Sequence, residues 1–299
     1  MSALNSLNHH FSIAGQLTFT ATDDGQQIAE INNAHAKASI ALQGAHVMTF
    51  QPHGEAPVLW MSENTHPAPG KAIRGGIPVC WPWFGDHPDK AFPQHGFARV
   101  QLWRVIGSEA LADGSTRVVF ELQKNEAARA QWPYSCHLRC TVTVGKTLTV
   151  ELATENLGEE AFTIGEALHT YLAVSDIEHI RVSGVEEAPY WDKVRDLRSV
   201  QNGAITFSGE FDRLFMNTSN DCVIDDAQFK RRIRIKKSGS SSTIVWNPWA
   251  EKSEKMGDMG KDGYRTMVCV ESGNAMDNIV TLAPGETHKM HAIYSVEPL

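Results

Sequence analysis

The sequence lacks the long apolar runs that mark membrane spans and secretion signals. No segment of the 299 residues approaches the roughly 20 consecutive apolar residues that a transmembrane helix needs. The first residues, Met1 to Gly15, carry neither a basic stretch nor a continuous apolar stretch, so we expect no signal peptide. These absences predict a cytoplasmic protein that does not bind membranes.

Basic residues are also fewer than acidic residues. The chain has 27 Lys and Arg residues against 35 Asp and Glu residues, which gives a formal net charge of −8. Nucleic acids and anionic membranes bind basic surfaces, so the sequence predicts neither as a partner. If the ligand is an anion, its cationic partners must be concentrated locally, because the protein as a whole repels it.

Cysteine is sparse and irregularly spaced. The chain has 5 cysteines, an odd number without a recurring spacing, which disfavours a disulfide framework and fits a reducing compartment. Cys136 and Cys140 have the same parity in a strand-like run, so we expect both to face a protein core. The 13 histidines show no compact ligand spacing, so the sequence predicts no metal and no cofactor.

Two familiar motifs are missing as well. The chain has no Gly-x-Ser-x-Gly nucleophile elbow and no Gly-x-Gly-x-x-Gly loop, which removes the main support for a hydrolase or a dinucleotide-binding enzyme. It also has no internal repeat and no Ser/Gly-rich linker. We therefore expect a single domain over residues 1–299.

Short alternating segments rich in β-branched residues dominate the chain. Turn sequences such as Asp113-Gly114 and Gly145-Lys146 separate them, and no βαβ alternation is present. The one helix expected lies around Asn125 to Gln131. This pattern predicts an all-β fold, a sandwich or a barrel. The strands are expected within Ala38–Phe50, Thr116–Leu122, Leu138–Leu152, Ala161–Val174, Arg231–Ile235, Thr243–Trp246 and Met267–Glu271.

Two segments do not fit the strand pattern. Gly70 to Arg99 is rich in Pro, Gly and aromatic residues, and a loop of that length and aromatic content indicates a functional segment. Trp81, Trp83 and Phe84 within it either stack on a sugar ring or close the end of a sandwich. Trp249 to Gly263, rich in Lys, Glu, Met and Gly, is either a mobile lid or a solvated loop.

His169 and Glu271 are the candidates for acid–base chemistry. Alternation along the segment around His169 places it beside Tyr171 on one face, either in a concave polar patch or as a half-buried, hydrogen-bonded histidine. Glu271 closes an apolar strand. Burial there would raise its pKa toward that of a general base near neutrality; the alternative is that the strand reaches solvent at this residue.

Arginine and aspartate supply the candidate binding groups. Arg74 precedes a Gly-Gly pair, so backbone amides and a guanidinium could converge on one anion, and Arg99 closes a second loop. A surface salt bridge is the alternative for each. Asp212 either accepts hydrogen bonds from sugar hydroxyls or pairs with its neighbour Arg213.

Together these segments resemble the D-hexose-6-phosphate mutarotases, a branch of the galactose-mutarotase-like superfamily. The matching blocks lie in order over about two hundred residues, and the first two are specific. They are Arg-Gly-Gly-Ile-Pro-Val-Cys-Trp-Pro-Trp-Phe-Gly (74–85), Pro-Gln-His-Gly-Phe-Ala-Arg (93–99), Leu-His-Thr-Tyr-Leu (168–172), Phe-Asp-Arg (211–213), Val-Trp-Asn-Pro-Trp (245–249), Met-Gly-Asp-Met (256–259) and Val-Glu (270–271).

The resemblance implies a large twisted β-sandwich with its active site in a concave cleft. His169 would be the general acid and Glu271 the general base. The substrate would be a hexose 6-phosphate, glucose 6-phosphate above all. Apart from the resemblance, we expect the protein to be a monomer. The residues that would bind substrate are Arg74, Gln94, Arg99 and Asp212, the two arginines at the phosphate.

Anomerisation suits these residue types. A histidine near its usual pKa of about 6.5 and a glutamate raised toward neutrality can open and reclose a sugar ring in both directions. Three alternatives remain open: an aldose 1-epimerase acting on free hexoses, a carbohydrate-binding or regulatory module without turnover, and, least supported, a glycosidase, which would need a pair of carboxylates.

Overall fold

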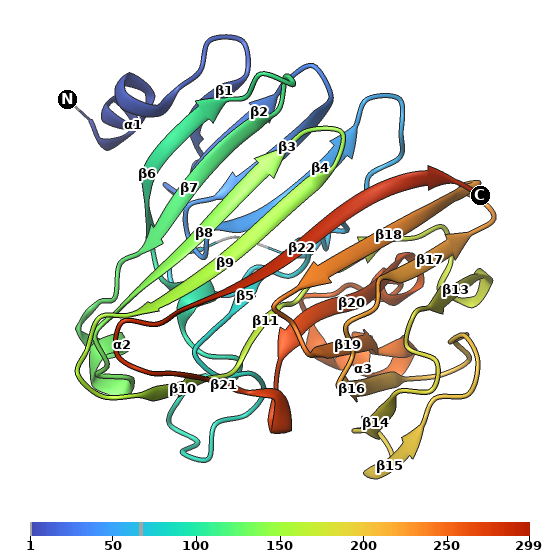
Figure 1. Ribbon diagram of the computed structural model, residues 1–299. Coiled ribbons are helices and arrows are strands. Elements are labelled where there is room, and N and C mark those ends of the chain that lie inside the picture. Colours follow the sequence, from blue (N-terminus) through green and yellow to red (C-terminus); the bar gives the residue numbers. More distant parts are fainter. Residues whose placement is uncertain (1, 66–67) are drawn as a thin grey trace.

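The protein is built almost entirely from antiparallel β-sheets. The computed structural model describes residues 2–65 and 68–299 (Figure 1). Within these residues two eight-stranded sheets, one four-stranded sheet and one two-stranded sheet are present, with a few short helices at their margins. The all-β prediction is therefore confirmed.

The longest strands form the eight-stranded sheet in front in Figure 1, which we call the front sheet. Its inner face lies against the other sheets. Its strands, in spatial order, are β13 (Ile180–Ser183), β17 (Cys222–Asp226), β18 (Arg231–Ser238), β22 (Thr287–Pro298), β9 (Leu148–Asn156), β8 (Cys136–Val144), β7 (Thr116–Leu122) and β6 (Trp103–Ala110).

Behind one half of the front sheet lies the second eight-stranded sheet, which we call the site sheet (Figure 1). Its strands are β15 (Leu197–Val200), β14 (Pro189–Asp192), β16 (Phe211–Met216), β19 (Ser242–Asn247), β20 (Met267–Asn274), β11 (Glu166–Leu168) and β5 (Val79–Cys80), with β12 (Tyr171–Ala173) also paired to β20. The small sheet pairs β10 (Phe162–Ile164) with β21 (Val280–Leu282).

Behind the other half of the front sheet lies the four-stranded sheet (Figure 1). It runs through β1 (Leu17–Ala21), β2 (Gln27–Asn32), β3 (Ala36–Ala41) and β4 (His46–Pro52). One cluster of buried apolar side chains reaches from Leu17 to Tyr294 and fills the space between the layers. The layers thus form a sandwich, as the resemblance implied.

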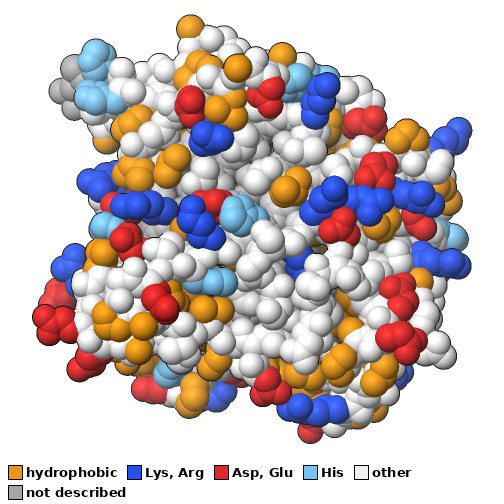
Figure 2. Space-filling view, viewed as in Figure 1, with side chains coloured by type: hydrophobic (Ala, Val, Ile, Leu, Met, Phe, Trp, Pro, Cys, Tyr) orange, Lys and Arg blue, Asp and Glu red, His pale blue; other side chains and the backbone are white. Residues whose placement is uncertain are grey.

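Strict alternation of side chains produces the two faces of the front sheet. Along β8 every second residue from Leu138 to Val144 is buried, and Cys140 belongs to this set, as expected. Cys136, at the strand end, is only partly buried and packs against the core. On the outer face, Lys and Arg lie among Asp and Glu (Figure 2), as in the Arg232–Asp225 pair across β17 and β18 at 2.6 Å.

The helices are short, and the sequence predicted one of the three α-helices. Helix α2 (Glu126–Gln131) begins after Asn125, whose side chain accepts a hydrogen bond from Ala128 N, so this prediction is confirmed. Helices α1 (Ala3–Phe11) and α3 (Trp249–Met256) were missed. In the described part of the chain no helix is long and apolar enough to span a membrane.

The expected strands all exist, but two expectations need correction. The segment 161–174 is three strands, β10, β11 and β12, with His169 and Thr170 in the break between the last two. The segment 249–263 connects β19 to β20 but is not a plain solvated loop. It contains α3 and leads into the 3₁₀ helix η3 (Gly263–Thr266). Met256, the last residue of α3, packs against a buried cluster that includes Trp246 and Cys269 of the site sheet, and the hydroxyl of Ser253 donates to the carbonyl of Gly260 within the segment.

The segment 70–99 is irregular apart from β5 and the start of the 3₁₀ helix η1 (Ala98–Val100), and glycines let it lie tightly on the sheets. Gly96 has a φ of 71°, and an ideal Cβ added there would overlap the carbonyl oxygen of Trp81. That oxygen accepts hydrogen bonds from the amides of Phe97 and Ala98, at 3.1 Å and 3.3 Å. The path of the loop toward Arg99 therefore depends on the absence of a side chain at Gly96.

Replacing Gly96 with alanine should destabilise the protein strongly. The left-handed backbone costs alanine about 1–2 kcal/mol, and the shift forced by the overlap adds about 1–3 kcal/mol. Gly203, with a φ of 66° and nothing within 4 Å of an added Cβ, is the matched control and should show only the first cost. Denaturant unfolding measures both, and equal losses of stability would contradict this account of Gly96.

Candidate active site

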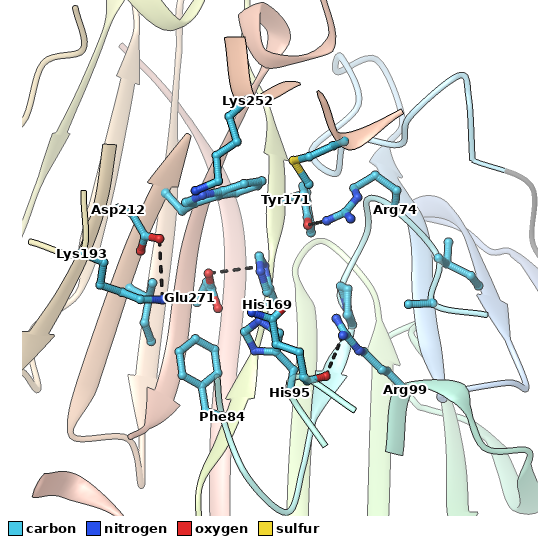
Figure 3. Close-up of a pocket in the computed structure, with 17 residues that line it drawn as sticks. Arg74, Phe84, His95, Arg99, His169, Tyr171, Lys193, Asp212, Lys252 and Glu271 are labelled. Atoms are coloured by element: carbon cyan, nitrogen blue, oxygen red, sulfur yellow. Dashed lines mark hydrogen bonds and ion pairs between the residues drawn. The ribbon is translucent and has the colours of Figure 1, made fainter. Parts of the chain in front are cut away.

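One pocket of about 210 Å³ lies over the site sheet and collects residues that are far apart in the sequence (Figure 3). Its walls come from the segment 70–99, the break between β11 and β12, the strands β16, β19 and β20, and helix α3. All six site residues predicted from the sequence line it, namely Arg74, Gln94, Arg99, His169, Asp212 and Glu271.

Glu271 lies within β20, not at its end. The strand runs on to Asn274, with β19 on one side, so the side chain of Glu271 is only 2% exposed. The alternative that the strand reaches solvent at this residue is wrong. Burial raises the pKa of Glu271 well above its ordinary value, and the negative charge of Asp212 raises it further.

His169 faces Glu271 from the break between β11 and β12. Its backbone N–H donates to the carbonyl of Pro78 at 3.0 Å, which anchors the break to the segment 70–99. Its ring stacks on Tyr171, with centroids 4.9 Å apart and planes at 7°, and Trp246 meets both rings edge-on. The expected neighbourhood of His169 and Tyr171 is thus present, although the strand is interrupted.

The two candidate acid–base groups lie close together. His169 Nδ1 is 3.3 Å from Glu271 Oε1 (Figure 3). Burial lowers the pKa of His169 well below its ordinary value, and the positive charges of Arg99 and Arg74 lower it further. The expectation of a histidine near 6.5 is therefore wrong, because burial is a property of the folded chain that the sequence did not reveal.

Arg74 is held by two partners at one wall of the pocket. Its Nε and Nη2 each lie 3.1 Å from Asp258 Oδ2, and its Nη1 donates to the hydroxyl of Tyr171 at 2.8 Å. The expected convergence of Gly-Gly amides on an anion is not seen for Gly76, because its N–H donates to the carbonyl of Trp60 at 2.7 Å.

Arg99 is less engaged than Arg74. Its Nη2 donates to the carbonyl of Gln94 at 2.7 Å, which closes the loop between the two residues. Its Nε is buried without a hydrogen-bond partner in the described part of the chain. The side chain of Gln94 is exposed and lines the same end of the pocket.

Asp212 projects from β16 on the opposite side from the arginines (Figure 3). Its Oδ2 is 3.6 Å from Lys193 Nζ, and burial raises its pKa. The alternative pairing with Arg213 is wrong, because Arg213 points to the other face of the sheet and binds Asp192 through Nε at 3.1 Å.

The pocket contains residues that the sequence did not single out. Lys193 and Lys252 line it, and Lys252 pairs with Glu210 at 2.6 Å. His95 lies beside His169, with ring centroids 5.6 Å apart. The block 93–99 offered a signal for His95, whereas no motif marked either lysine.

The geometry of His95 defines its protonation. Its Nδ1 accepts a hydrogen bond from the N–H of Gly85 at 3.2 Å. Burial and the charge of Arg99 lower the pKa of His95 well below its ordinary value, so the ring is neutral and carries its proton on Nε2. His95 is therefore a fixed hydrogen-bond donor among cations.

The aromatic residues of the segment 70–99 divide between two roles. Trp81 is fully buried and packs against Phe97 and Trp132, so it closes the end of the sandwich. Trp83 packs against Phe97 as well. Only Phe84 of the three predicted aromatics lines the pocket.

Comparison with known proteins identifies the family. A family model described as aldose 1-epimerase matches residues 27–295. The chain belongs to the aldose 1-epimerase family. Two relatives, from Salmonella typhimurium and Escherichia coli, are 41% and 40% identical over 251 and 256 residues, and the matches cover 83% and 85% of both chains. Both carry the name "Putative glucose-6-phosphate 1-epimerase".

A solved structure supports the same assignment of this epimerase. The chain superposes on a crystal structure from Salmonella typhimurium, described as "a putative mutarotase (YeaD)", with a TM-score of 0.90 and 34% identity over 100% of both chains. The recognition of the family and its galactose-mutarotase-like fold are confirmed, and the chain is placed among epimerases.

One group of possible metal ligands also converges in the described part of this epimerase. The ligand atoms of His169, Cys269 and Glu271 lie within 4.8 Å of one another, and all three residues are buried. Burial raises the pKa of the Cys269 thiol well above its ordinary value, which disfavours the thiolate that a metal requires. The sequence-based expectation of a metal-free site stays a prediction.

Replacing Asp212 with asparagine should lower the pKa of Glu271 in this epimerase. The substitution keeps the size of the side chain and removes the negative charge that raises this pKa. Carbon-13 NMR titration of the Glu271 carboxyl measures the shift. The matched control is Glu210→Gln on the Lys252 pair, which should change the pKa of Glu271 less. No difference between the two variants would contradict the assigned cause.

Proposed function

We propose that this epimerase interconverts the α and β anomers of a hexose 6-phosphate, glucose 6-phosphate above all. The observation that carries the proposal is the buried pair of His169 and Glu271, which shares one pocket with Arg74 and Arg99. The names of the two relatives support the same substrate.

The chemistry needs one proton acceptor and one proton donor. The carboxylate of Glu271 removes the proton from the C1 hydroxyl while the imidazolium of His169 protonates the ring oxygen. The C1–O5 bond then breaks and leaves an open-chain aldehyde. After rotation about C1–C2 the O5 hydroxyl attacks the other face of the aldehyde. His169 takes the proton back from O5 while Glu271 returns its proton to O1, so the enzyme is unchanged.

Burial suits the pair to this task. It favours the uncharged forms of both groups, since it lowers the pKa of His169 and raises that of Glu271. Near neutrality the pair therefore holds one proton, and moving that proton between groups 3.3 Å apart converts one tautomer into the other. Each positioned proton transfer contributes about 10²–10⁴-fold to the rate.

The phosphate belongs on the arginine side of the pocket. Lys193 and Lys252 have carboxylate partners, Asp212 and Glu210, whereas Arg99 has no carboxylate partner in the described part of the chain. Its buried, unpartnered Nε provides a donor for an anion. Because the net charge of −8 repels an anionic ligand, the binding site must supply positive charge locally, and Arg99 supplies it.

The remaining wall suits the sugar ring. Asp212 accepts hydrogen bonds from ring hydroxyls, and Gln94 provides both a donor and an acceptor. The neutral ring of His95 donates through Nε2, and Phe84 offers an apolar face for the carbon skeleton. In this arrangement the sugar spans the pocket, with C1 at His169 and Glu271.

Replacing His169 with asparagine should lower kcat by about 10²–10⁴-fold and leave KM within about threefold, because the ring transfers a proton but adds little binding energy. NMR exchange spectroscopy between the anomers of glucose 6-phosphate measures the rate above the uncatalysed background. The matched control is His291→Asn on the outer face, where His291 pairs with Glu151. An unchanged kcat for His169→Asn would remove His169 from the acid role.

Replacing Arg99 with alanine should lower kcat/KM for glucose 6-phosphate by about 10- to 100-fold, the value of a charge-assisted hydrogen bond. The same change should alter kcat/KM for free glucose by less than about threefold. Arg104→Ala, which breaks an outer-face pair with Glu121, controls for the loss of an arginine. Equal losses on both sugars would make Arg99 structural, and equal wild-type efficiency on free glucose would favour a free-hexose epimerase.

A further inference from the structure

The ring of His169 is oriented by packing rather than by hydrogen bonding. In the described part of the chain no hydrogen bond of standard geometry reaches either ring nitrogen, and the polar contact of the buried Nδ1 is with Glu271 Oε1 at 3.3 Å. Catalytic histidines are commonly fixed by a hydrogen bond to the second ring nitrogen. Here the flat stack on Tyr171, 4.9 Å between centroids, takes that place.

Tyr171 is itself held on two sides. Its ring stacks on Trp60, with centroids 5.9 Å apart and planes at 21°. Its hydroxyl accepts the 2.8 Å hydrogen bond from Arg74 Nη1. Burial raises the pKa of Tyr171, so the phenol stays protonated at neutral pH and does not compete with His169 as an acid. The position of the tyrosine ring therefore depends on the guanidinium.

Arg74 is in turn held by Asp258, which follows helix α3. Two guanidinium nitrogens lie 3.1 Å from the same carboxylate oxygen, and the arginine side chain is only 24% exposed. The backbone at Asp258 is fixed by Ser62, whose hydroxyl donates to the carbonyl of Asp258 at 2.6 Å. His169 is thus linked to the segment after α3 through three consecutive contacts, of which Figure 3 shows the hydrogen bond from Arg74 to Tyr171.

We propose that Asp258, Arg74 and Tyr171 form a positioning chain that fixes the ring of His169 for proton transfer. Asp258, Arg74 and Tyr171 are then positioning residues, and the phosphate lies at Arg99. The inference rests on the proposed function, since it takes His169 as the acid. The inference gives the two arginines different roles, because Arg99 takes no part in the positioning chain.

The test uses Tyr171→Phe, which keeps the stack and removes the hydroxyl, and Asp258→Asn, which keeps an acceptor and removes the charge. Each should lower kcat about 10- to 100-fold with KM within about threefold, the range seen when outer contacts of a catalytic group are removed. The fall should be the same with glucose 6-phosphate and with free glucose, because the chain acts on His169 and not on the phosphate.

Two substitutions of the same kind elsewhere provide matched controls. Tyr190→Phe removes a buried tyrosine hydroxyl outside the pocket, and Asp176→Asn removes the partner of Arg265. Both should leave kcat within about twofold of the wild type. Thermal unfolding of all four variants shows whether each is folded at the assay temperature.

Three kinetic outcomes would overturn the chain. An unchanged kcat in both test variants would mean that Asp258 and Tyr171 take no part in the reaction. A loss of activity confined to glucose 6-phosphate, or a rise in KM at constant kcat, would assign the two residues to substrate binding. Crystal structures of the variants give an independent reading. We expect the His169 ring to rotate or to occupy two orientations in these variants. A ring in its wild-type orientation would contradict the positioning chain.

The failure of the proposed function would look different. A wild-type protein without anomerase activity, or a His169→Asn variant with full activity, would reject the acid role of His169. The crystallographic test would still show whether Asp258 and Tyr171 orient the ring. The two proposals can therefore fail separately.

Discussion

The burial of a carboxyl group inside the site sheet is the constraint on which the rest of the pocket depends. Glu271 is enclosed by β19 and by the break before β12, and a lone carboxylate in such a place is costly. Burial therefore raises the pKa of Glu271, and the positive charges of Lys193 and Arg99 offset part of the cost of its carboxylate form, with His169 Nδ1 3.3 Å away. In this position the carboxyl of Glu271 is shielded from water and its pKa stays raised. A carboxyl exposed to solvent would have the ordinary pKa of a glutamate.

Rigidity around that pair comes from segments without regular structure. The segment 70–99 contributes Arg74, Gln94, His95 and Arg99, and it is fastened by backbone contacts that only glycine allows, as at Gly96. The same segment receives the backbone N–H of His169 at Pro78. The acid and the arginines therefore share one support, and a displacement of the loop would move both ends of the substrate site together.

Local patterns predicted the strands well because alternation records which face is buried, and β7 has the bounds that its pattern gives. The sequence blocks shared with the family also identified six candidate residues, and all six line one pocket. The pattern failed where tertiary contacts decide. Helix α3 is short and polar, and its last residue, Met256, packs against buried residues of the site sheet. Lys193 follows strand β14 and belongs to no motif, so the sequence did not mark it. The lowered pKa of His169 was missed as well, because it depends on burial by segments that are distant in the sequence.

The two arginines of the pocket look equivalent in the sequence, since each ends or begins a glycine-containing loop. Their partners make them different. A guanidinium bound to a carboxylate and a phenol has most of its donors committed, so its position is fixed and its remaining attraction for an anion is reduced. Arg99, bound to one carbonyl, keeps its charge available. In the proposed function, Arg99 would bind the phosphate ester of the substrate while Arg74 orders Tyr171 and, through it, His169.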